Sequence, residues 1–362
     1  MADNSNAVMI LAGGTGGHVF PGLAVANELQ RLGRPVVWMG TQRGIEASIV
    51  PAAGIAVEWV SIAGIRGRGL TSWLAAPVRL VRALWQALAI LARVKPAAVL
   101  GMGGFVSGPG GVAAWLTRRP LLIHEQNSVA GTTNRMLARI ASVVFEAFPG
   151  SFSHAIGAIQ VGNPVRPALR ELDDPAQRFG GRLPGQARRL LILGGSQGAR
   201  SLNDTLPEAL ALLPGGERPE VWHQAGRSAQ QVREAYAARG IDATVTEFID
   251  DMAEAYAWAD LAVCRAGALT LAELAAVGLG SILVPYPYAI DDHQLKNAQY
   301  FVERGAAQLV VEAELTAETL SDSLRQLLAQ RDRLVELARV SRALDYPAAA
   351  EQVAAACVGA AR

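Results

Sequence analysis

The stretch Leu11–Leu29, LAGGTGGHVFPGLAVANEL, decides the fold. It is typical of the end of a β-strand, a glycine-rich loop and the beginning of a helix. A second stretch of the same kind, LILGGSQGARSLNDTL, begins at Leu191, half the chain further on. A chain of 362 residues exceeds the usual size of one domain. The repeated stretch therefore predicts two domains, each with its own glycine loop.

Short apolar runs rich in β-branched residues alternate with longer helical segments in both halves of the chain. In the first half these runs are AVMILA, VVWMG, VEWVSI, AAVLGM, LLIHE and VVFEAF, and in the second half RRLLILGG, EVWHQAG, TVTEFI, LAVCRAG, SILVPYP and AAQLVV. Strands that alternate with helices form parallel βαβ units. We therefore predict an α/β fold of two Rossmann-like, doubly wound parallel-sheet domains that face a cleft.

A segment rich in proline and charge, VGNPVRPALRELDDPAQRFGGRLPGQ, separates the two halves. We expect the N-terminal domain to cover residues 1–163, the linker to begin at Pro164, and the C-terminal domain to cover residues 164–345. The last segment, residues 346–362, is rich in alanine and predicts a helix that can pack back on the N-terminal domain.

The composition is that of an ordinary globular protein. Hydrophobic residues make up 51% of the chain and the formal net charge is +1, so nothing indicates a nucleic-acid partner. Cys264 and Cys357 have no spacing typical of a disulfide framework or a metal site, which favours a reducing compartment. We see no signal peptide. The longest apolar stretch, from Trp73, is interrupted by Arg79 and Arg82, so we expect no membrane span.

A glycine-rich loop between a strand and a helix presents backbone N–H groups to an anion, and its glycines allow close approach. One such loop can be only a tight turn, but two at corresponding places favour binding of a phosphate or a sugar. A dinucleotide oxidoreductase fits poorly, because Val19 occupies the third fingerprint position and the second strand ends in WMGTQRG, where an acidic residue would bind the ribose. The sequence has no P-loop, no D-x-D motif and no His/Cys cluster, so neither an NTPase nor a metal is indicated.

Two further loops follow predicted strands: GMGGFVSGPGG begins at Gly101 and HEQNSVAG begins at His124. In open α/β sheets, ligands bind beyond the carboxyl ends of the strands. We therefore expect these loops to converge with the first glycine loop on one cleft. That convergence places His18, Glu125 and Asn127 within reach of one another.

Eight motifs run in order from residue 12 to residue 298: AGGTGGHVFPGLAVA, GMGGFVSGPGG, HEQN, VGNPVR, GGSQGAR, TEFIDDM, CRAGALTLAEL and DHQLKNA. Together they closely resemble the bacterial N-acetylglucosaminyltransferases of peptidoglycan synthesis, the MurG family. The resemblance implies a two-domain GT-B glycosyltransferase that uses neither metal nor cofactor. It implies transfer of N-acetylglucosamine from UDP to the 4-hydroxyl of the muramyl sugar of undecaprenyl-pyrophosphoryl-MurNAc-pentapeptide (lipid I to lipid II), with inversion at the anomeric carbon.

The resemblance also places the donor mainly in the C-terminal domain. It implies that Ser196 and Arg166 contact the diphosphate and that Ile249 contacts the uracil. Without a metal, the charge on leaving UDP needs helix N-terminal N–H groups and cations such as Arg166 or Arg265. The resemblance further implies that the nucleotide is lined by Ala268, Leu269, Thr270, Leu271, Ala272 and Glu273, and the donor sugar by Gln294, Asn127, Thr15, Gly16 and Gly17.

The resemblance assigns Glu273 to the ribose hydroxyls, and a carboxylate with two acceptor oxygens suits vicinal hydroxyls. Taken from the residues alone, a helix N-terminal carboxylate favoured by the macrodipole is the better interpretation.

The acceptor hydroxyl must lose a proton, and imidazole has an unperturbed pKa of about 6.5 that suits a general base. His18 is our first candidate for this catalytic residue, and Glu125 is our second. The alternative for His18 is a loop histidine that caps backbone groups or binds phosphate. The other histidines are weaker candidates (His124 and His293) or are expected to be structural (His154 and His223).

No acidic residue occurs between Glu58 and Glu125, so this region presents positive potential to an anionic partner. Its cations are Arg66, Arg68, Arg79, Arg82, Arg93, Lys95, Arg118 and Arg119.

The lipid acceptor that the resemblance implies gives this region a role. We expect Gly103 and Gly104 on the acceptor side, and a basic, apolar surface around Arg79, Arg82 and Trp85 that rests on anionic headgroups. This predicts peripheral association with the cytoplasmic face of the bacterial inner membrane. The alternative is an amphipathic helix packed on the sheet, with its arginines only solvated.

Two competing functions stay open. One is another UDP-sugar enzyme of the GT-B type, such as a 2-epimerase or a glycolipid synthase. The other is a non-catalytic sensor of nucleotide sugars. Release of UDP with transfer of the sugar to lipid, rather than isomerisation of the sugar, separates a transferase from an epimerase. The complete set of His18, Glu125, Asn127 and Glu273 argues against a non-catalytic sensor.

Overall fold

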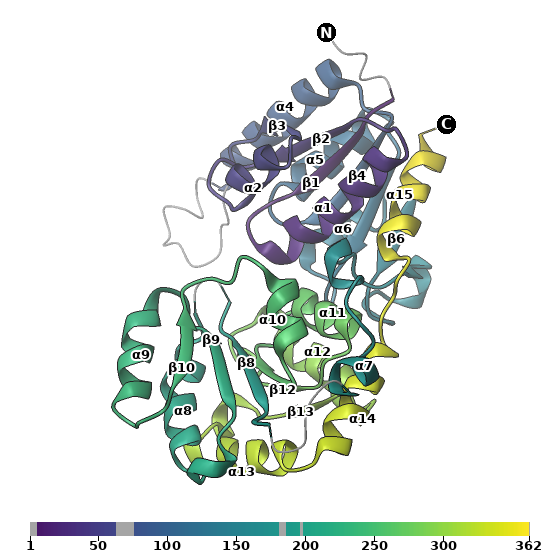
Figure 1. Cartoon of the computed structure of the whole chain (residues 1–362). Coiled ribbons are helices and arrows are strands. Elements are labelled where there is room, and N and C mark those ends of the chain that lie inside the picture. The colour runs from purple at the N-terminus through teal and green to yellow at the C-terminus, as the bar shows by residue number, and fades with distance from the viewer. Residues whose placement is uncertain (1–5, 63–75, 181–185, 196–197, 362) are drawn as a thin grey trace. The chain divides into compact units, whose positions relative to one another are not determined.

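The computed structural model describes residues 6–62, 76–180, 186–195 and 198–361. The chain forms two units (Figure 1). Unit 1 comprises Met1–Arg166 and Tyr346–Arg362, and unit 2 comprises Pro167–Asp345. Unit 1 thus extends slightly past the expected boundary at residue 163, because the side chain of Val165 is still buried there.

Unit 1 contains a seven-stranded parallel sheet with the strand order β3-β2-β1-β4-β5-β6-β7. The strands are β1 Val8–Ala12, β2 Val36–Gly40, β3 Ala56–Trp59, β4 Ala98–Gly103, β5 Leu121–Glu125, β6 Val143–Glu146 and β7 Ile159–Gln160. Strands β2 and β3 are added on one side of β1, and β4 to β7 are added on the other, so the strand order reverses between β1 and β4. Such a switch point is where ligands bind in doubly wound folds.

Helices cover both faces of this sheet: α1 Gly16–Arg31, α2 Glu46–Ala52, α4 Ala76–Val94, α5 Ser107–Leu116, α6 Thr132–Leu137 and α15 Ala349–Ala360. Successive side chains of a strand point to opposite faces. Val8 and Ile10 therefore enter the core shared with α1 and α15, whereas Met9 and Leu11 enter the core shared with α4 and α5. The C-terminal helix α15 packs beside α1 and buries Val353 in this first core.

Unit 2 contains a six-stranded parallel sheet with the order β10-β9-β8-β11-β12-β13. The strands are β8 Arg189–Leu193, β9 Glu220–Gln224, β10 Ala243–Thr246, β11 Leu261–Cys264, β12 Ser281–Leu283 and β13 Ala307–Leu309. Its switch point lies between β8 and β11, which corresponds to β1 and β4 of unit 1. The prediction of two doubly wound parallel sheets is confirmed.

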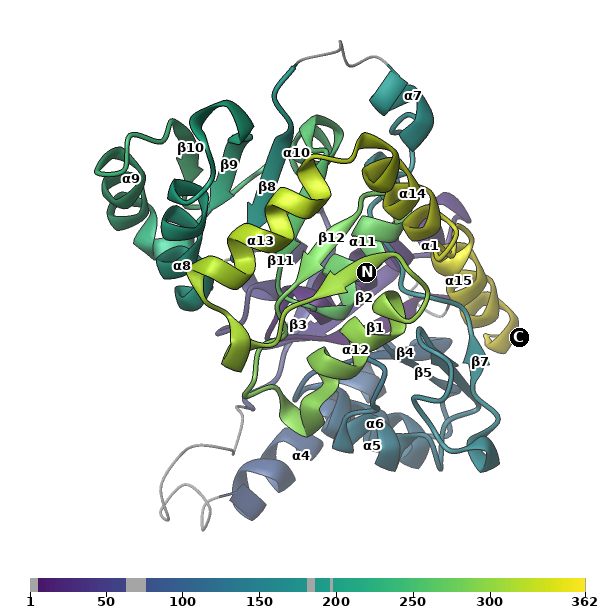
Figure 2. The ribbon, with the colours of Figure 1, turned by 90° about the horizontal axis from the view of Figure 1, so that it is seen from below.

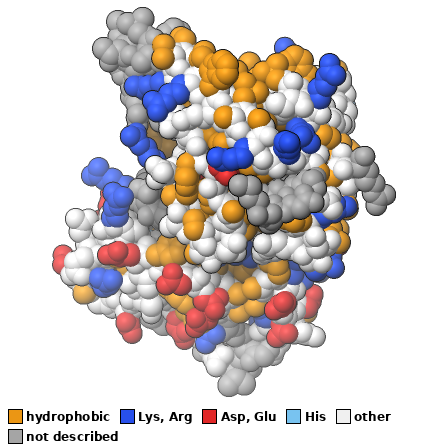
Figure 3. Space-filling model, turned by 90° about the horizontal axis from the view of Figure 1, so that it is seen from above, with side chains coloured by type: hydrophobic (Ala, Val, Ile, Leu, Met, Phe, Trp, Pro, Cys, Tyr) orange, Lys and Arg blue, Asp and Glu red, His pale blue; other side chains and the backbone are white. Residues whose placement is uncertain are grey.

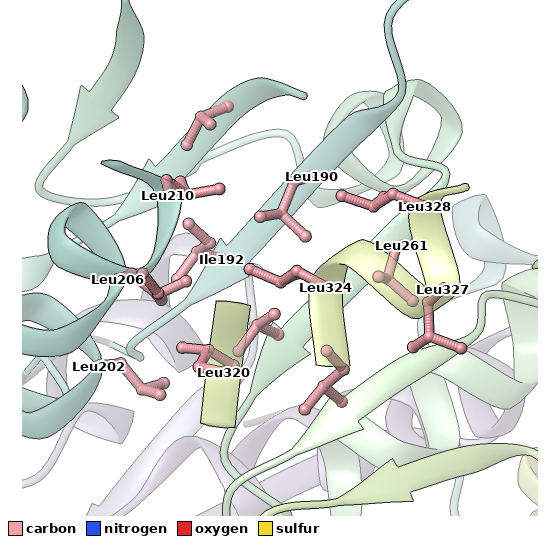
Figure 4. Close-up of a cluster of buried hydrophobic side chains, with 14 of the residues drawn as sticks. Leu190, Ile192, Leu202, Leu206, Leu210, Leu261, Leu320, Leu324, Leu327 and Leu328 are labelled. Atoms are coloured by element: carbon pink, nitrogen blue, oxygen red, sulfur yellow. The ribbon is translucent and has the colours of Figure 1, made fainter. Parts of the chain in front are cut away.

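The helices of unit 2 are α7 Pro175–Gly180, α8 Arg200–Ala211, α9 Ala229–Ala237, α10 Met252–Trp258, α11 Ala268–Val277, α12 His293–Val302, α13 Ala317–Leu328 and α14 Arg331–Arg342. Helices α8 and α13 lie side by side on one face of the sheet (Figure 2). The apolar side chains of both helices meet those of β8 and β11 in one leucine-rich core, which includes Leu190, Leu206, Leu261 and Leu324 (Figure 4). This core fixes the carboxyl ends of the central strands, where the predicted donor residues lie.

Candidate active site

The loops after β1 and β4 meet at the switch point of unit 1. Gly104 has a left-handed φ of 81°, and a Cβ atom there would lie 2.3 Å from the carbonyl oxygen of Gly13. Ser107 Oγ lies 3.0 Å from the carbonyl oxygen of Leu11 and accepts a hydrogen bond from the N–H of Gly103 over 3.1 Å. Only glycine allows this approach at position 104, so the two loops are in direct backbone contact.

The side chain of Glu46 binds the backbone of the first glycine loop. Its carboxylate is completely buried. Oε2 accepts a hydrogen bond from the N–H of Gly14 over 2.9 Å, and Oε1 accepts from the N–H and the hydroxyl of Thr41 over 3.0 and 2.7 Å. A buried carboxylate is stable when hydrogen-bond donors surround it. Glu46 therefore ties the loop after β1 to the end of β2.

His18 lies in the first turn of α1 and is half-buried. Its Nδ1 atom lies 3.1 Å from Oε1 of Gln126. A Cβ atom at Gly103, where φ is 102°, would come within 2.6 Å of the same Nδ1 atom, so glycine makes room for the ring. The remaining predicted residues of this loop are accessible at the start of the helix: Thr15, Gly16 and Gly17.

Glu125 ends β5 and is 2% exposed. Oε1 accepts from the backbone and side-chain amides of Asn127 over 3.0 and 3.2 Å, and Oε2 accepts from the N–H of Gly131 over 3.1 Å and from Nδ2 of Asn134 over 2.9 Å. These four hydrogen bonds shape the loop between β5 and α6. The residue of this loop that bonds to His18 is Gln126, which stands between Glu125 and Asn127 in the sequence.

The other histidines occupy different environments. His124 and His223 are completely buried, and burial lowers their pKa values to about 4 and about 3. His154 is exposed, and His293 begins α12 and is half-buried. Across the described ranges, no three His, Cys, Asp or Glu side chains are grouped as a metal site requires.

In unit 2, Glu273 lies in the second turn of α11 and is 5% exposed. Its Oε2 atom accepts a hydrogen bond from the hydroxyl of Tyr256 over 3.0 Å. Among its predicted neighbours on α11, Leu271 is fully buried, so its side chain belongs to the core. Leu271 can therefore contact a ligand only through its backbone. The others are half-buried (Leu269, Thr270 and Ala272) or buried (Ala268).

Arg265, predicted as a cation for the diphosphate, holds several loops of unit 2 together. It forms an ion pair with Glu312, its Nη2 atom donates to Ser201 Oγ over 2.8 Å, and its Nη1 atom donates to the carbonyl oxygen of Val284 over 3.1 Å. The guanidinium group also lies 5.5 Å from the ring centroid of Tyr286. These contacts hold Arg265 against the loops around β11, and its contact with a diphosphate stays a prediction.

The remaining predicted donor residues lie before α10 (Ile249), in the first turn of α12 (Gln294) and at the end of unit 1 (Arg166). Ile249 is 3% exposed, so only its backbone is available, whereas the neighbouring Phe248 is 51% exposed. Gln294 accepts a hydrogen bond from the N–H of Tyr286 over 3.0 Å. Arg166, at the end of unit 1, lies over the ring of Phe20 at 4.7 Å. Ser196, Arg66 and Arg68 lie outside the described residues.

Helices α4, α5 and α6 expose large apolar side chains among arginines. This α4–α6 face comprises Val78, Leu80, Val81, Trp85, Trp115, Leu116 and Met136 together with Arg79, Arg82, Arg118, Arg135 and Arg139. Figure 3 shows such hydrophobic and basic side chains mixed along the upper edge of the view. Trp85 is 70% exposed. Among the helices that the structure describes, none has the length and apolar character to span a bilayer.

Sequence reasoning missed four residues that organise the site: Gln126, Glu46, Tyr256 and Glu312. Gln126 stands inside the motif HEQN, and that position is the only signal that could have pointed to it. Nothing in the sequence pairs Tyr256 with Glu273, or Glu312 with Arg265, because each pair joins distant segments.

Comparison with known families matches both halves of the chain. The N-terminal domain of glycosyltransferase family 28 matches residues 8–146, and the C-terminal domain of the same family matches residues 189–353.

Known proteins are similar along the whole chain. A protein of Nitrosococcus oceani named UDP-N-acetylglucosamine–N-acetylmuramyl-(pentapeptide) pyrophosphoryl-undecaprenol N-acetylglucosamine transferase is 55% identical, with 97% of this chain and 98% of the relative covered. A protein of the same name from Alkalilimnicola ehrlichii is 56% identical, with 98% and 99% covered. The crystal structure of Acinetobacter baumannii MurG is 38% identical and superposes with a TM-score of 0.82, covering 97% of this chain and 99% of that one.

Proposed function

Because the chain belongs to glycosyltransferase family 28, we propose that it catalyses the reaction in its relatives' name, the transfer of N-acetylglucosamine from UDP to undecaprenyl-pyrophosphoryl-MurNAc-pentapeptide in peptidoglycan synthesis. The observation that carries this proposal is the identity of 55% and 56% to transferases of that name over nearly the full length of both chains. The accepting group is the 4-hydroxyl of the muramyl sugar, and lipid I becomes lipid II.

The reaction is a single displacement with inversion. The acceptor oxygen bonds to the anomeric carbon of N-acetylglucosamine while the bond from that carbon to the β-phosphate oxygen breaks. The electron pair leaves with UDP, and the hydroxyl proton passes to a general base. A positioned base typically contributes about 10²- to 10⁴-fold to such a step.

His18 is the base in this proposal. It lies at the switch point of unit 1, beside the glycine loops after β1 and β4, and its ring is accessible. The hydrogen bond at Nδ1 leaves Nε2 as the ring nitrogen for the acceptor hydroxyl. Glu125 suits this task less well, because it is buried and accepts four hydrogen bonds from its own loop. Its role in the proposal is to position Asn127.

Unit 2 binds the donor in this proposal. Glu273 accepts hydrogen bonds from the ribose hydroxyls, with Tyr256 holding one carboxylate oxygen in place. The backbone of Ile249 reads the uracil, and the half-buried side chains on the first turns of α11 line the nucleotide. Gln294 contacts the sugar.

The diphosphate is bound without a metal. Helix N-termini offer N–H groups to an anion, and α8 and α11 both begin directly after glycine-containing loops. Arg166 supplies a side-chain contact in this proposal. Arg265 acts indirectly, by holding the loop that leads into α11.

Unit 1 receives the lipid acceptor, with Gly103 and Gly104 on the acceptor side. Its α4–α6 face is suited to an anionic membrane surface, because exposed apolar side chains, two of them tryptophans, lie among exposed arginines on it. Apolar side chains enter the headgroup region while each well-placed cation contributes roughly 1 kcal/mol. We propose peripheral attachment to the cytoplasmic face of the inner membrane through this face.

The experiment is an assay of the full chain with UDP-N-acetylglucosamine, a short-chain lipid-pyrophosphoryl-MurNAc-pentapeptide and a chelator, followed by mass spectrometry of the disaccharide product. We expect product with wild-type protein and with His154→Ala, an exposed control histidine of unit 1. We expect about 10²-fold less or slower product with His18→Ala.

Absence of product with and without magnesium, together with saturable binding of the UDP-sugar, would reject this reaction. It would favour a different acceptor or a sensor. Isomerisation of the sugar instead of transfer would favour an epimerase.

A further inference from the structure

Gln126 lies between two histidines in the core of unit 1. Its side chain is 2% exposed. The amide nitrogen Nε2 lies 2.8 Å from the carbonyl oxygen of Met102 and 3.2 Å from Nδ1 of His124, and the amide oxygen Oε1 lies 3.1 Å from Nδ1 of His18. The amide thus joins the end of β4 to both rings.

The chemistry of these neighbours fixes the orientation of the amide. A carbonyl oxygen only accepts hydrogen bonds, so the group of Gln126 that faces Met102 must be the NH₂ group. The backbone carbonyl oxygen of His124 lies 3.3 Å from the same nitrogen and adds a second acceptor. A flipped amide would place its oxygen against two carbonyl oxygens. Oε1 must therefore face His18.

The tautomer of His124 agrees with this orientation. Its Nε2 atom lies 2.9 Å from the carbonyl oxygen of Gly162, so Nε2 carries the proton and Nδ1 accepts from Gln126. Burial lowers the pKa of His124 to about 4, which keeps the ring neutral and Nδ1 unprotonated near neutral pH. A continuous series of hydrogen bonds runs from Gly162 through His124 and Gln126 to His18.

The last bond in this series determines the state of His18. Oε1 of Gln126 can only accept, so Nδ1 of His18 must carry its proton. In neutral imidazole the other nitrogen then holds the lone pair. Gly103 packs against the Nδ1 edge of the ring, and no described residue forms a hydrogen bond to Nε2.

We propose that Gln126 is a positioning residue for the transfer reaction: its side-chain oxygen holds the proton of His18 on Nδ1 and so presents Nε2 to the acceptor hydroxyl as an unprotonated base. Gln126 does not touch the reacting atoms. The inference rests on the proposed function of His18 as the base. It adds the reason why one ring nitrogen, and not the other, accepts the proton.

The test reads the tautomer directly. The full chain, labelled with ¹⁵N-histidine, is examined by two-bond ¹H–¹⁵N correlation spectra at about pH 8, where an ordinary imidazole is neutral. The chain has 5 histidines, and the spectrum of His18→Gln identifies the signals of His18. We expect wild-type His18 to be protonated on Nδ1.

Two variants then separate positioning from stability. Gln126→Met keeps the length of the side chain but removes the acceptor, and we expect a shift of His18 towards the Nε2–H tautomer. We also expect kcat to fall about 10²-fold, with the KM for UDP-N-acetylglucosamine within about twofold of wild type. Asn134→Leu removes another buried amide, on helix α6, that bonds to the backbone carbonyl of His124 and to Glu125. We expect it to leave His18 protonated on Nδ1.

A wild-type His18 protonated on Nε2, or an unchanged tautomer in Gln126→Met, would overturn the proposal. The wild-type spectrum decides the matter even if Gln126→Met does not fold. The spectra need no substrate, so lack of transfer activity in the wild type would reject the proposed function and leave the test of Gln126 intact.

Discussion

The hydroxyl of Tyr256 donates a hydrogen bond of 3.0 Å to Oε2 of Glu273, and both side chains are buried. The bond fixes the rotamer of the carboxylate that we assign to the ribose. Tyr256→Phe removes this hydroxyl and keeps the aromatic ring. We expect the KM for UDP-N-acetylglucosamine to rise about five- to tenfold, roughly 1 kcal/mol, with kcat little changed. Steady-state kinetics with varied donor measures this.

A matched control is Tyr236→Phe. Tyr236 is a second buried tyrosine of unit 2, and its hydroxyl lies 3.1 Å from Nδ1 of His223. We expect this variant to lose stability without a change in the KM for the donor. Equal KM values in both variants would show that Tyr256 does not prepare Glu273 for the nucleotide.

We expect substitution of Glu125 to lower stability and substitution of His18 to lower kcat. Glu125→Gln turns one acceptor oxygen into an NH₂ group that faces two donors, so two hydrogen bonds are lost. We expect the free energy of unfolding to fall by about 2–4 kcal/mol. His18→Ala should leave it nearly unchanged while kcat falls. Urea unfolding and transfer kinetics on both variants measure the difference. A Glu125→Gln protein as stable as wild type but as inactive as His18→Ala would make Glu125 the base.

The α4–α6 face predicts binding to anionic lipid. Reversing two charges in Arg79→Glu/Arg82→Glu should weaken cosedimentation with anionic vesicles at least about tenfold, since each well-placed cation contributes roughly 1 kcal/mol. The control Arg200→Glu/Arg325→Glu makes the same change of net charge on exposed residues of unit 2. It should bind as wild type does. Equal loss in both double variants would mean that net charge, and not this face, attracts the vesicles.

Periodicity and loop chemistry were enough to predict the fold. Apolar runs such as LLIHE became strands because both faces of a parallel sheet are covered by helices and favour continuous hydrophobic sequence. The strand β7, Ile159–Gln160, was not predicted, because two residues carry no periodic signal. Its pairing with β6 depends on tertiary contact alone.

The site was predicted only as far as backbone topology determines it. His18 and the loop after β5 follow strands of the same sheet, so their approach follows from the order of the elements. That His18 bonds to Gln126 and not to Glu125 depends on side-chain rotamers and on which groups donate. Arg265 and Glu312 lie in two segments far apart in the sequence. The residue type alone therefore indicated a cation for the diphosphate at Arg265 and gave no sign of its carboxylate partner.

We expect the free energy of unfolding to fall as the pH is lowered, because two histidines are buried in the folded chain. His124 and His223 have pKa values lowered by burial to about 4 and about 3, whereas unfolded histidine has a pKa of about 6.5. Below about pH 6.5 the unfolded chain binds protons that the folded chain does not, so each histidine removes up to about 1.4 kcal/mol per pH unit until its folded pKa is reached.

The two-variant comparison isolates this effect. Between about pH 6.5 and 5, His223→Gln should lose roughly 2 kcal/mol less than wild type in urea unfolding of unit 2. His154→Gln, at an exposed position, should lose as much as wild type. A slope in His223→Gln equal to that of wild type would assign the acid sensitivity to other groups.

Because Glu46 accepts a hydrogen bond from Gly14, we predict that the geometry of the first glycine loop depends on this carboxylate at the start of α2. In Glu46→Gln the NH₂ group must face either the N–H of Gly14 or the N–H of Thr41, because each oxygen of the wild-type carboxylate accepts from a backbone donor. Thr41 offers a hydroxyl as well, so the amide oxygen should stay with Thr41 and the loop should lose its anchor. We expect about 2 kcal/mol less stability and, because this loop leads into His18, about tenfold lower kcat.

Thr41→Val removes only the hydroxyl bond and should cost about 1 kcal/mol with kcat within twofold of wild type. If Glu46→Gln lost stability but transferred at the wild-type rate, Glu46 would stabilise the fold without shaping the site.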